Sequence, residues 1–160
     1  MRISVAAVGR LKQGPERDLC ERYIARATAL GRGLGLAEVC VREIAESRAA
    51  RAQDRAIAEA VSLRRILVPG ARLVALDERG PPLTSAAFAN DILRARDAGV
   101  PAYALVIGGA DGLASELRGE ADLVLSFGPM TWPHQLVRIM AAEQVYRATT
   151  ILAGHPYHRA

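Results

Sequence analysis

The segment Tyr103-Ala104-Leu105-Val106-Ile107-Gly108-Gly109 carries the clearest secondary-structure signal in this chain. Its first five residues are apolar, and the paired glycines that follow are poor continuations of a strand. The pattern predicts a buried strand at Tyr103–Ile107 that ends in a turn at Gly108-Gly109. Two other apolar segments, Arg2–Val8 and Arg72–Leu76, are likewise predicted to be strands.

On either side of these segments the chain alternates between strand-like and helix-like patterns. Further strands are expected at Leu36–Glu43 and Ala121–Ser126. Helices are expected at Glu16–Leu30, Ser47–Arg65, from a Thr84 cap to about Arg96, at Leu113–Arg118 with Asp111 as the cap, and from Pro133 to about Leu152. Strands separated by helices favour a mostly parallel sheet with helices on both faces. No linker divides residues 1–160, so we expect a single α/β domain.

The composition is that of a globular protein. The hydrophobic fraction is 51%, and no apolar run approaches the roughly 18–20 residues of a membrane-spanning helix. The opening Met1–Val8 is too short for a signal peptide, so we expect a cytoplasmic protein that binds no membrane. Cys20 and Cys40 lack metal-ligand spacing and are expected to be buried free thiols.

The charge balance is modestly basic. The formal net charge is +4, and every basic residue except Lys12 is an arginine. Arginine forms planar, bidentate contacts with phosphate, so the excess fits a nucleic-acid partner. A preference for arginine over lysine also follows from GC-rich coding, and charge alone therefore does not identify the partner.

The predicted last helix is apolar around most of its circumference. Its apolar positions are Leu136, Val137, Ile139, Met140, Ala141, Ala142, Val145, Tyr146, Ala148, Ile151 and Leu152. A helix of this kind is buried on more than one side. A second copy of the chain would cover it most economically, and we expect a homodimer with this helix at its centre.

Three loops follow predicted strands and meet at the carboxyl edge of the sheet, where parallel sheets bind ligands. They are Asp77–Gly80, Gly108–Gly112 and Phe127–His134. Neither G-x-G-x-x-G nor G-x-x-x-x-G-K-[ST] is present, so a phosphate cradle is not indicated. The glycine pair either permits close approach to a flat ring or is a plain turn. Trp132 would occupy the cap position of the last helix, where tryptophan is a poor capping residue.

The chain ends in an unusual concentration of titratable groups, His155-Pro156-Tyr157-His158-Arg159-Ala160. Chain ends are usually frayed and bland, whereas imidazoles titrate near neutral pH. The tail is therefore either docked in a site where it acts or an accident of composition. A metal site formed by His134, His155 and His158 is disfavoured by their spacing, and we expect no metal.

Four segments in order resemble the RlmH family of SPOUT-class ribosomal RNA methyltransferases, and the resemblance extends over the whole chain. They are Leu105–Gly112, Ser126–Arg138, Ala142–Ala148 and His155–Arg159. The resemblance implies a C-terminal trefoil knot, a homodimer and S-adenosylmethionine as the cofactor. It further implies that the substrate is a pseudouridine of 23S ribosomal RNA, methylated at N3 on the assembled ribosome.

The resemblance also assigns site residues. The cofactor contacts fall on Leu76, Gly108, Gly109, Phe127, Gly128, Pro129, Met130, Thr131 and Trp132. The sequence departs from the family at Phe127-Gly128-Pro129, where relatives are richer in Leu and Ser, and at Trp132, where they have a smaller apolar residue.

The chemistry implied by the resemblance needs a base for the N3 proton and a cation for the developing charge. His155, Tyr157, His158 and Arg159 supply these groups, with His134 assisting from the knot. Our preferred assignment has His158 as base or proton relay and Arg159 on a phosphate or on the imide oxygens. The tail serves either its own cofactor or that of the partner subunit.

Two other functions remain open at this point. A non-catalytic ribosome-binding factor with the same fold would use the tail only as a basic anchor. A Rossmann-type oxidoreductase is argued against by the missing glycine fingerprint.

Overall fold

A computed structural model describes residues 1–158 of the chain. Within those residues a five-stranded, all-parallel sheet has the strand order β2-β1-β4-β3-β5. The strands are β1 (Arg2–Val8), β2 (Glu38–Ile44), β3 (Arg72–Leu76), β4 (Ala102–Ile107) and β5 (Leu123–Leu125). The central strand β4 is buried along its whole length, as its apolar sequence predicts.

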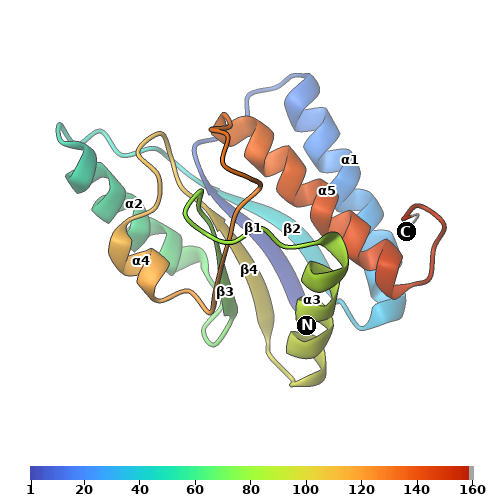
Figure 1. Cartoon of the computed structure of the whole chain (residues 1–160). Coiled ribbons are helices and arrows are strands. Elements are labelled where there is room, and N and C mark those ends of the chain that lie inside the picture. Colours follow the sequence, from blue (N-terminus) through green and yellow to red (C-terminus); the bar gives the residue numbers. More distant parts are fainter. Residues whose placement is uncertain (159–160) are drawn as a thin grey trace.

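Helices cover both faces of the sheet (Figure 1). One face carries α1 (Pro15–Gly31), α3 (Ser85–Asp97) and α5 (His134–Leu152), and the other carries α2 (Ala52–Ile66) and the short α4 (Ser115–Gly119). A single 3₁₀ turn, Arg32–Leu34, follows α1. The alternation of strands and helices therefore predicts both the parallel sheet and its two-sided cover correctly. No helix within residues 1–158 is long and apolar enough to cross a membrane.

Element boundaries follow the sequence prediction where hydrophobicity or a cap determines them. β1 and β3 have the predicted bounds, and the predicted cap Thr84 accepts a hydrogen bond from the Ala87 amide at 3.1 Å. The prediction that Asp111 caps the following short helix is wrong. Its carboxylate instead forms a bidentate pair with Arg55 at 2.7 and 3.0 Å, and the helix begins only at Ser115.

The helix predicted from Ser47 also begins later, at Ala52. Residues 45–51 form a loop whose backbone is bonded by two side chains of α2. Arg55 donates to the carbonyls of Ala49 and Ala50, and Glu59 accepts from the Ser47 amide at 2.9 Å. These side-chain hydrogen bonds satisfy backbone groups of the loop without the backbone hydrogen bonds of a helix.

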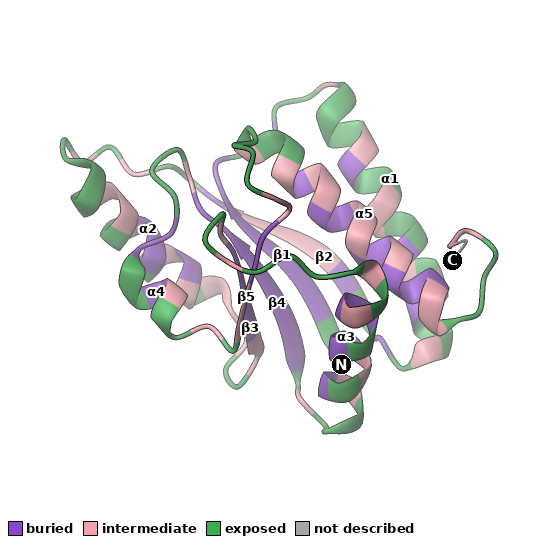
Figure 2. Ribbon diagram, viewed as in Figure 1, coloured by how far each residue is buried: buried purple, intermediate pink, exposed green. Residues whose placement is uncertain are grey.

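The apolar circumference of α5 is largely covered within the chain. The helix lies on the sheet and packs against α1 on one side and α3 on the other (Figure 1). Figure 2 shows the buried stripe of α5 facing the sheet, with less buried positions outward. The burial that the sequence pattern indicates therefore does not by itself require a second copy. Its outward positions include Leu136, which is 41% exposed.

Candidate functional site

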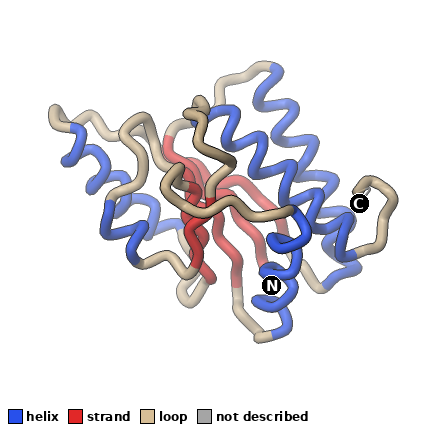
Figure 3. Tube along the Cα trace, in the orientation of Figure 1, coloured by secondary structure: helices blue, strands red, loops and turns tan. Residues whose placement is uncertain are grey.

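Two loops cross at the carboxyl edge of the sheet, one after β3 and one after β5. The backbone amide of Asp77 donates to the Leu125 carbonyl at 3.1 Å, and that of Ser126 donates to the Pro81 carbonyl at 3.1 Å. The contact is so close that a Cβ on Gly80 would lie 2.8 Å from the Leu125 nitrogen. Figure 3 shows these loops passing over the strands on the way to α3 and α5. The crossing fixes the end of β5 against the loop 77–82.

Two adjoining cavities lie at this crossing and share the lining segment 125–128. The larger, of about 300 Å³, extends to Ser85 and Phe88 of α3, Leu105 of β4 and Gln144 of α5. The smaller, of about 130 Å³, extends from Leu76 and Asp77 to Trp132 and Val137. Together they form a mostly apolar site with backbone groups of two loops along its rim.

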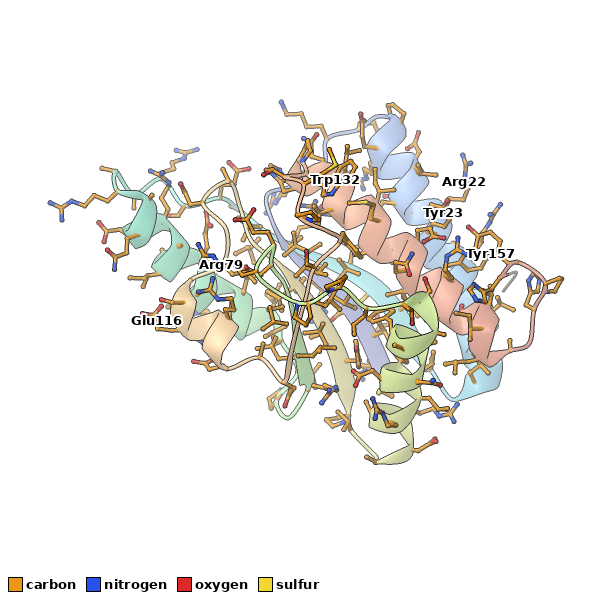
Figure 4. The ribbon with its side chains drawn as sticks, viewed as in Figure 1. Arg22, Tyr23, Arg79, Glu116, Trp132 and Tyr157 are labelled. Atoms are coloured by element: carbon orange, nitrogen blue, oxygen red, sulfur yellow. The ribbon has the colours of Figure 1, made fainter. Side chains whose placement is uncertain are left out.

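Most residues predicted to contact a cofactor lie in this site. The lining includes Leu76, Phe127, Gly128, Met130, Thr131 and Trp132. Within residues 1–158, Gly108, Gly109 and Pro129 line neither cavity. Met130 is 69% exposed and Trp132 is 40% exposed, although both line the smaller cavity. Figure 4 labels Trp132 beside the beginning of α5.

The glycine pair after β4 is explained by a tight turn. A Cβ on Gly108 would lie 2.4 Å from the Gly112 carbonyl carbon, and one on Gly109 would lie 3.0 Å from Glu59 Oε2. The Gly112 amide closes the turn on the Gly109 carbonyl at 3.0 Å. Of the two interpretations that the sequence allows, the plain turn thus accounts for both glycines.

The start of α5 differs from the predicted one. The helix begins at His134, Pro133 is its cap residue, and no side chain caps it, so Trp132 does not occupy the cap position. The imidazole of His134 lies beside Gly9, because a Cβ on Gly9 would be 3.5 Å from its Nε2 and 2.9 Å from Glu46 Oε1. His134 therefore lies at the carboxyl edge of the sheet, beside the end of β1.

The C-terminal tail turns back against the other end of α5 (Figure 1). The phenol of Tyr157 donates to Glu143 Oε1 at 3.1 Å, its ring centroid lies 4.7 Å from that of Tyr146, and the Arg147 guanidinium lies 4.9 Å over it. Burial and then the negative charge of Glu143 raise the pKa of Tyr157 to about 12. Tyr157 is therefore held as an anchor and remains a neutral phenol at neutral pH.

The two described histidines of the tail have different surroundings. His155 Nδ1 accepts a hydrogen bond from the Tyr157 amide at 3.1 Å, so its lone pair is used within the tail. His158 Nδ1 is buried and has no hydrogen-bond partner among residues 1–158. Arg159, the predicted cation, lies outside the described residues.

The predicted histidines are not brought together in one chain. His134 begins α5 and His155 follows its end, and a helix of 19 residues is about 28 Å long. His134 therefore cannot share a metal ion with the tail histidines of the same chain. Within residues 1–158, moreover, no group of three potential metal ligands is present.

One residue of the site, Gln144, and one buried residue of α5, Arg138, were missed by sequence reasoning. Gln144 lines the larger cavity and accepts a hydrogen bond from Ser85 Oγ at 2.9 Å. Arg138 is fully buried within α5 and pairs with Glu43 of β2. Neither has a recognisable signal by itself, because each partner is distant in the sequence.

The chain is similar to a protein family and to curated relatives along its whole length. Residues 1–158 match a family model described as a predicted SPOUT methyltransferase. A ribosomal RNA large subunit methyltransferase H from Rhodopseudomonas palustris is 58% identical over 160 residues, and one from Sinorhizobium medicae is 57% identical, each covering 100% of both chains. The crystal structure of a probable methyltransferase from Bordetella pertussis aligns with 92% of this chain and 95% of its own, at 16% identity and a TM-score of 0.48.

Proposed function

The chain belongs to the SPOUT methyltransferase family, and on that premise we propose that it methylates N3 of a pseudouridine in 23S ribosomal RNA, with S-adenosylmethionine as the methyl donor. The observation that carries the proposal is the identity of 58% along the full length of a relative named as a large-subunit ribosomal RNA methyltransferase. The chain acts as one domain, residues 1–160, on the assembled ribosome in the cytoplasm.

The paired cavities at the loop crossing suit S-adenosylmethionine. Leu105, Leu125 and Phe127 offer apolar contact to a flat base, and loop backbone groups can read its edge. The cofactor carries no phosphate, so the absence of a phosphate-binding glycine motif is consistent with it. When bound, it supplies an electrophilic methyl group on a sulfonium. The residues of this chain would hold it along 125–132 and Leu76.

The knot belongs to the same proposal. In a trefoil knot the C-terminal segment passes through an earlier loop, an exception to the usual rule that chains are unknotted. The crossing of residues 125–126 with the loop 77–82 is the contact that such a passage requires. It also gives the site its shape, since both cavities border that crossing.

The active site is completed by a second copy of the chain. In one chain Tyr157 lies against Glu143 and Arg147, in the middle and second half of α5, whereas Met130 and Trp132 precede the beginning of that helix. A homodimer through the outward face of α5, where Leu136 is exposed, covers that face and brings one subunit's tail toward the other's site.

Contacts within the tail favour one assignment of roles to its side chains. N3 of the base must lose its proton to become a nucleophile, so a neutral base with a free lone pair is needed. Tyr157 is unsuited as the base, because its pKa is raised to about 12 and its hydroxyl donates a hydrogen bond to Glu143. The His155 lone pair is occupied by the Tyr157 amide. His158 therefore serves as the base or proton relay, with Arg159 contacting RNA.

Deleting residues 157–160 tests this assignment. The truncated protein should bind S-adenosylmethionine nearly as tightly as the full chain in calorimetry, because the cavities are left intact. It should transfer no labelled methyl group to ribosomes that lack the modification. His158→Gln should be strongly impaired and Tyr157→Phe only weakly. Full activity of the truncated protein, or no cofactor binding by the full chain, would overturn the proposal.

Light scattering tests the dimer separately. The full chain at micromolar concentration should have twice the mass of the monomer, and Leu136→Asp should lower it. A monomeric mass for the full chain would contradict the shared site.

A further inference from the structure

A chain of hydrogen bonds connects the larger cavity with the C-terminal tail. Ser85 Oγ donates to Gln144 Oε1 at 2.9 Å, and Gln144 Nε2 donates to Glu143 Oε2 at 2.8 Å. Glu143 Oε1 then accepts from the Tyr157 hydroxyl at 3.1 Å. Arg147 adds two bonds to the same oxygen, at 2.9 and 2.6 Å. The first two residues line the cavity, and the last anchors the tail.

Gln144 and Glu143 form the middle of this hydrogen-bond network and connect Ser85 with Tyr157. The Glu143 side chain is 17% exposed, and both of its oxygens are used, one by Gln144 and one by Arg147 and Tyr157. The Gln144 amide accepts at one end and donates at the other, so turning it would break both bonds together. Charge-assisted hydrogen bonds of this type are stronger than neutral ones. The orientation of the Gln144 amide thus influences the carboxylate that holds Tyr157.

We infer that Gln144 and Glu143 are positioning residues that couple occupancy of the larger cavity to the placement of the tail. The inference rests on the proposed function, since it takes S-adenosylmethionine as the occupant. A ligand that bonds to Ser85 or Gln144 competes with the existing bond between them. The resulting change reaches Tyr157 through Glu143, and with it the adjacent His158. Cofactor bound in one subunit would thereby place the base of that subunit's tail, which acts in the partner's site.

The tail has contacts that do not belong to this network, and these make the inference testable. The Tyr157 ring packs on Tyr146 and under Arg147, independently of its hydroxyl. Variants that remove only hydrogen bonds therefore leave the tail attached. In these variants the tail would no longer respond to the cofactor, while the Tyr157 ring would remain packed on Tyr146 and under Arg147.

Hydrogen exchange of the amides of residues 153–155, 157 and 158 measures this response without using catalysis. In the full chain, saturating S-adenosylmethionine should change the tail exchange rate by about fivefold, the effect of one net hydrogen bond. Gln144→Leu should still bind the cofactor in calorimetry but lose this change. Ser85→Ala removes only the bond between Ser85 and Gln144, and it should also lose the change in exchange rate. This variant replaces Gln144→Leu if the latter does not fold. Glu21→Gln is the matched control, because it removes a similar Arg–Glu pair (2.7 Å) on α1.

Steady-state kinetics provide the second readout. Gln144→Leu should lower kcat about fivefold with little change in the KM for ribosomes, because the tail is misplaced rather than lost. In a double-mutant cycle, Glu143→Gln and Tyr157→Phe should be non-additive. The inference would be overturned if the cofactor changed the exchange rate of the tail amides equally in the full chain and in Gln144→Leu. It would also be overturned if the cofactor left that exchange rate unchanged in a full chain that methylates RNA. A full chain that neither binds the cofactor nor methylates RNA would instead overturn the proposed function.

Discussion

Arg138 should be one of the largest single contributors to the stability of this protein. Its side chain is 0% exposed near the beginning of α5, where it pairs with Glu43. Its Nη2 donates to the carbonyls of Val8 and Gly9 at 3.0 and 3.1 Å. The guanidinium thereby ties α5 to the ends of β1 and β2, next to the loop that contacts His134. Burial lowers the pKa of Arg138, and the charge of Glu43 opposes that shift.

Replacing Arg138 with leucine removes the charge and all of these donors. Breaking a buried ion pair by deleting one partner costs about 3–5 kcal/mol, because the other charge is left without compensation. Two carbonyls that now accept from the guanidinium would also lose a donor. A loss in this range corresponds to a fall in Tm of about 6–20 °C for a domain of this size.

Urea unfolding of four proteins measures the effect: the full chain, Arg138→Leu, Glu43→Gln and the double variant. The double variant should be less destabilised than the sum of the single variants, because removing both partners leaves no isolated charge. Arg65→Leu is the control, since Arg65 is exposed without an ionic partner among residues 1–158, and it should change stability by less than about 0.5 kcal/mol. A loss below about 1 kcal/mol for Arg138→Leu, or strict additivity, would refute the reasoning.

Three further predictions concern single groups. Burial raises the pKa of Glu59, so the contribution of this carboxyl to the free energy of unfolding is lost as pH rises through that pKa. The Tm of Glu59→Gln should therefore rise relative to the Tm of the full chain between pH 4 and pH 8. A Tm difference that stays constant over this range would contradict the prediction. Burial raises the pKa of Cys20 to about 11, so iodoacetamide at pH 8 should label Cys40 first in peptide mass spectra, and equal labelling would count against it. Thr84→Ala should cost about 1 kcal/mol in urea unfolding and Thr84→Ser much less, whereas equal losses would exclude the capping role.

The sheet was predictable from the sequence because its determinants are local. The apolar runs at Arg2–Val8 and Arg72–Leu76 set the strand ends, and the helical segments between strands required parallel pairing. Local signals failed where a distant partner competed for the same group. Asp111 had the residue type of a cap, yet Arg55, 56 residues away in the sequence, holds its carboxylate.

The candidate site was predicted in outline, and its internal connections were not. Residues 127, 128 and 130–132 line the smaller cavity at the loop crossing, and their contact with a cofactor stays a prediction. The sequence pattern does not single out Arg138 within the last helix, because its partner Glu43 is 95 residues away. The tail was predicted as a group of reactive side chains, whereas the structure distinguishes an anchor in Tyr157 from a histidine with a free buried nitrogen in His158. Such distinctions depend on tertiary contacts that no sequence pattern records.

Nucleoside mass spectrometry of ribosomal RNA is the strictest test of the proposed methylation. Ribosomes that lack the modification are incubated with the protein and with S-adenosylmethionine carrying an isotopically labelled methyl group, and the large-subunit RNA is then digested to nucleosides. The account predicts one labelled product, a pseudouridine methylated at N3, and none after incubation with the protein lacking residues 157–160. No label in the RNA, or label on a ribose or on another base, would contradict it.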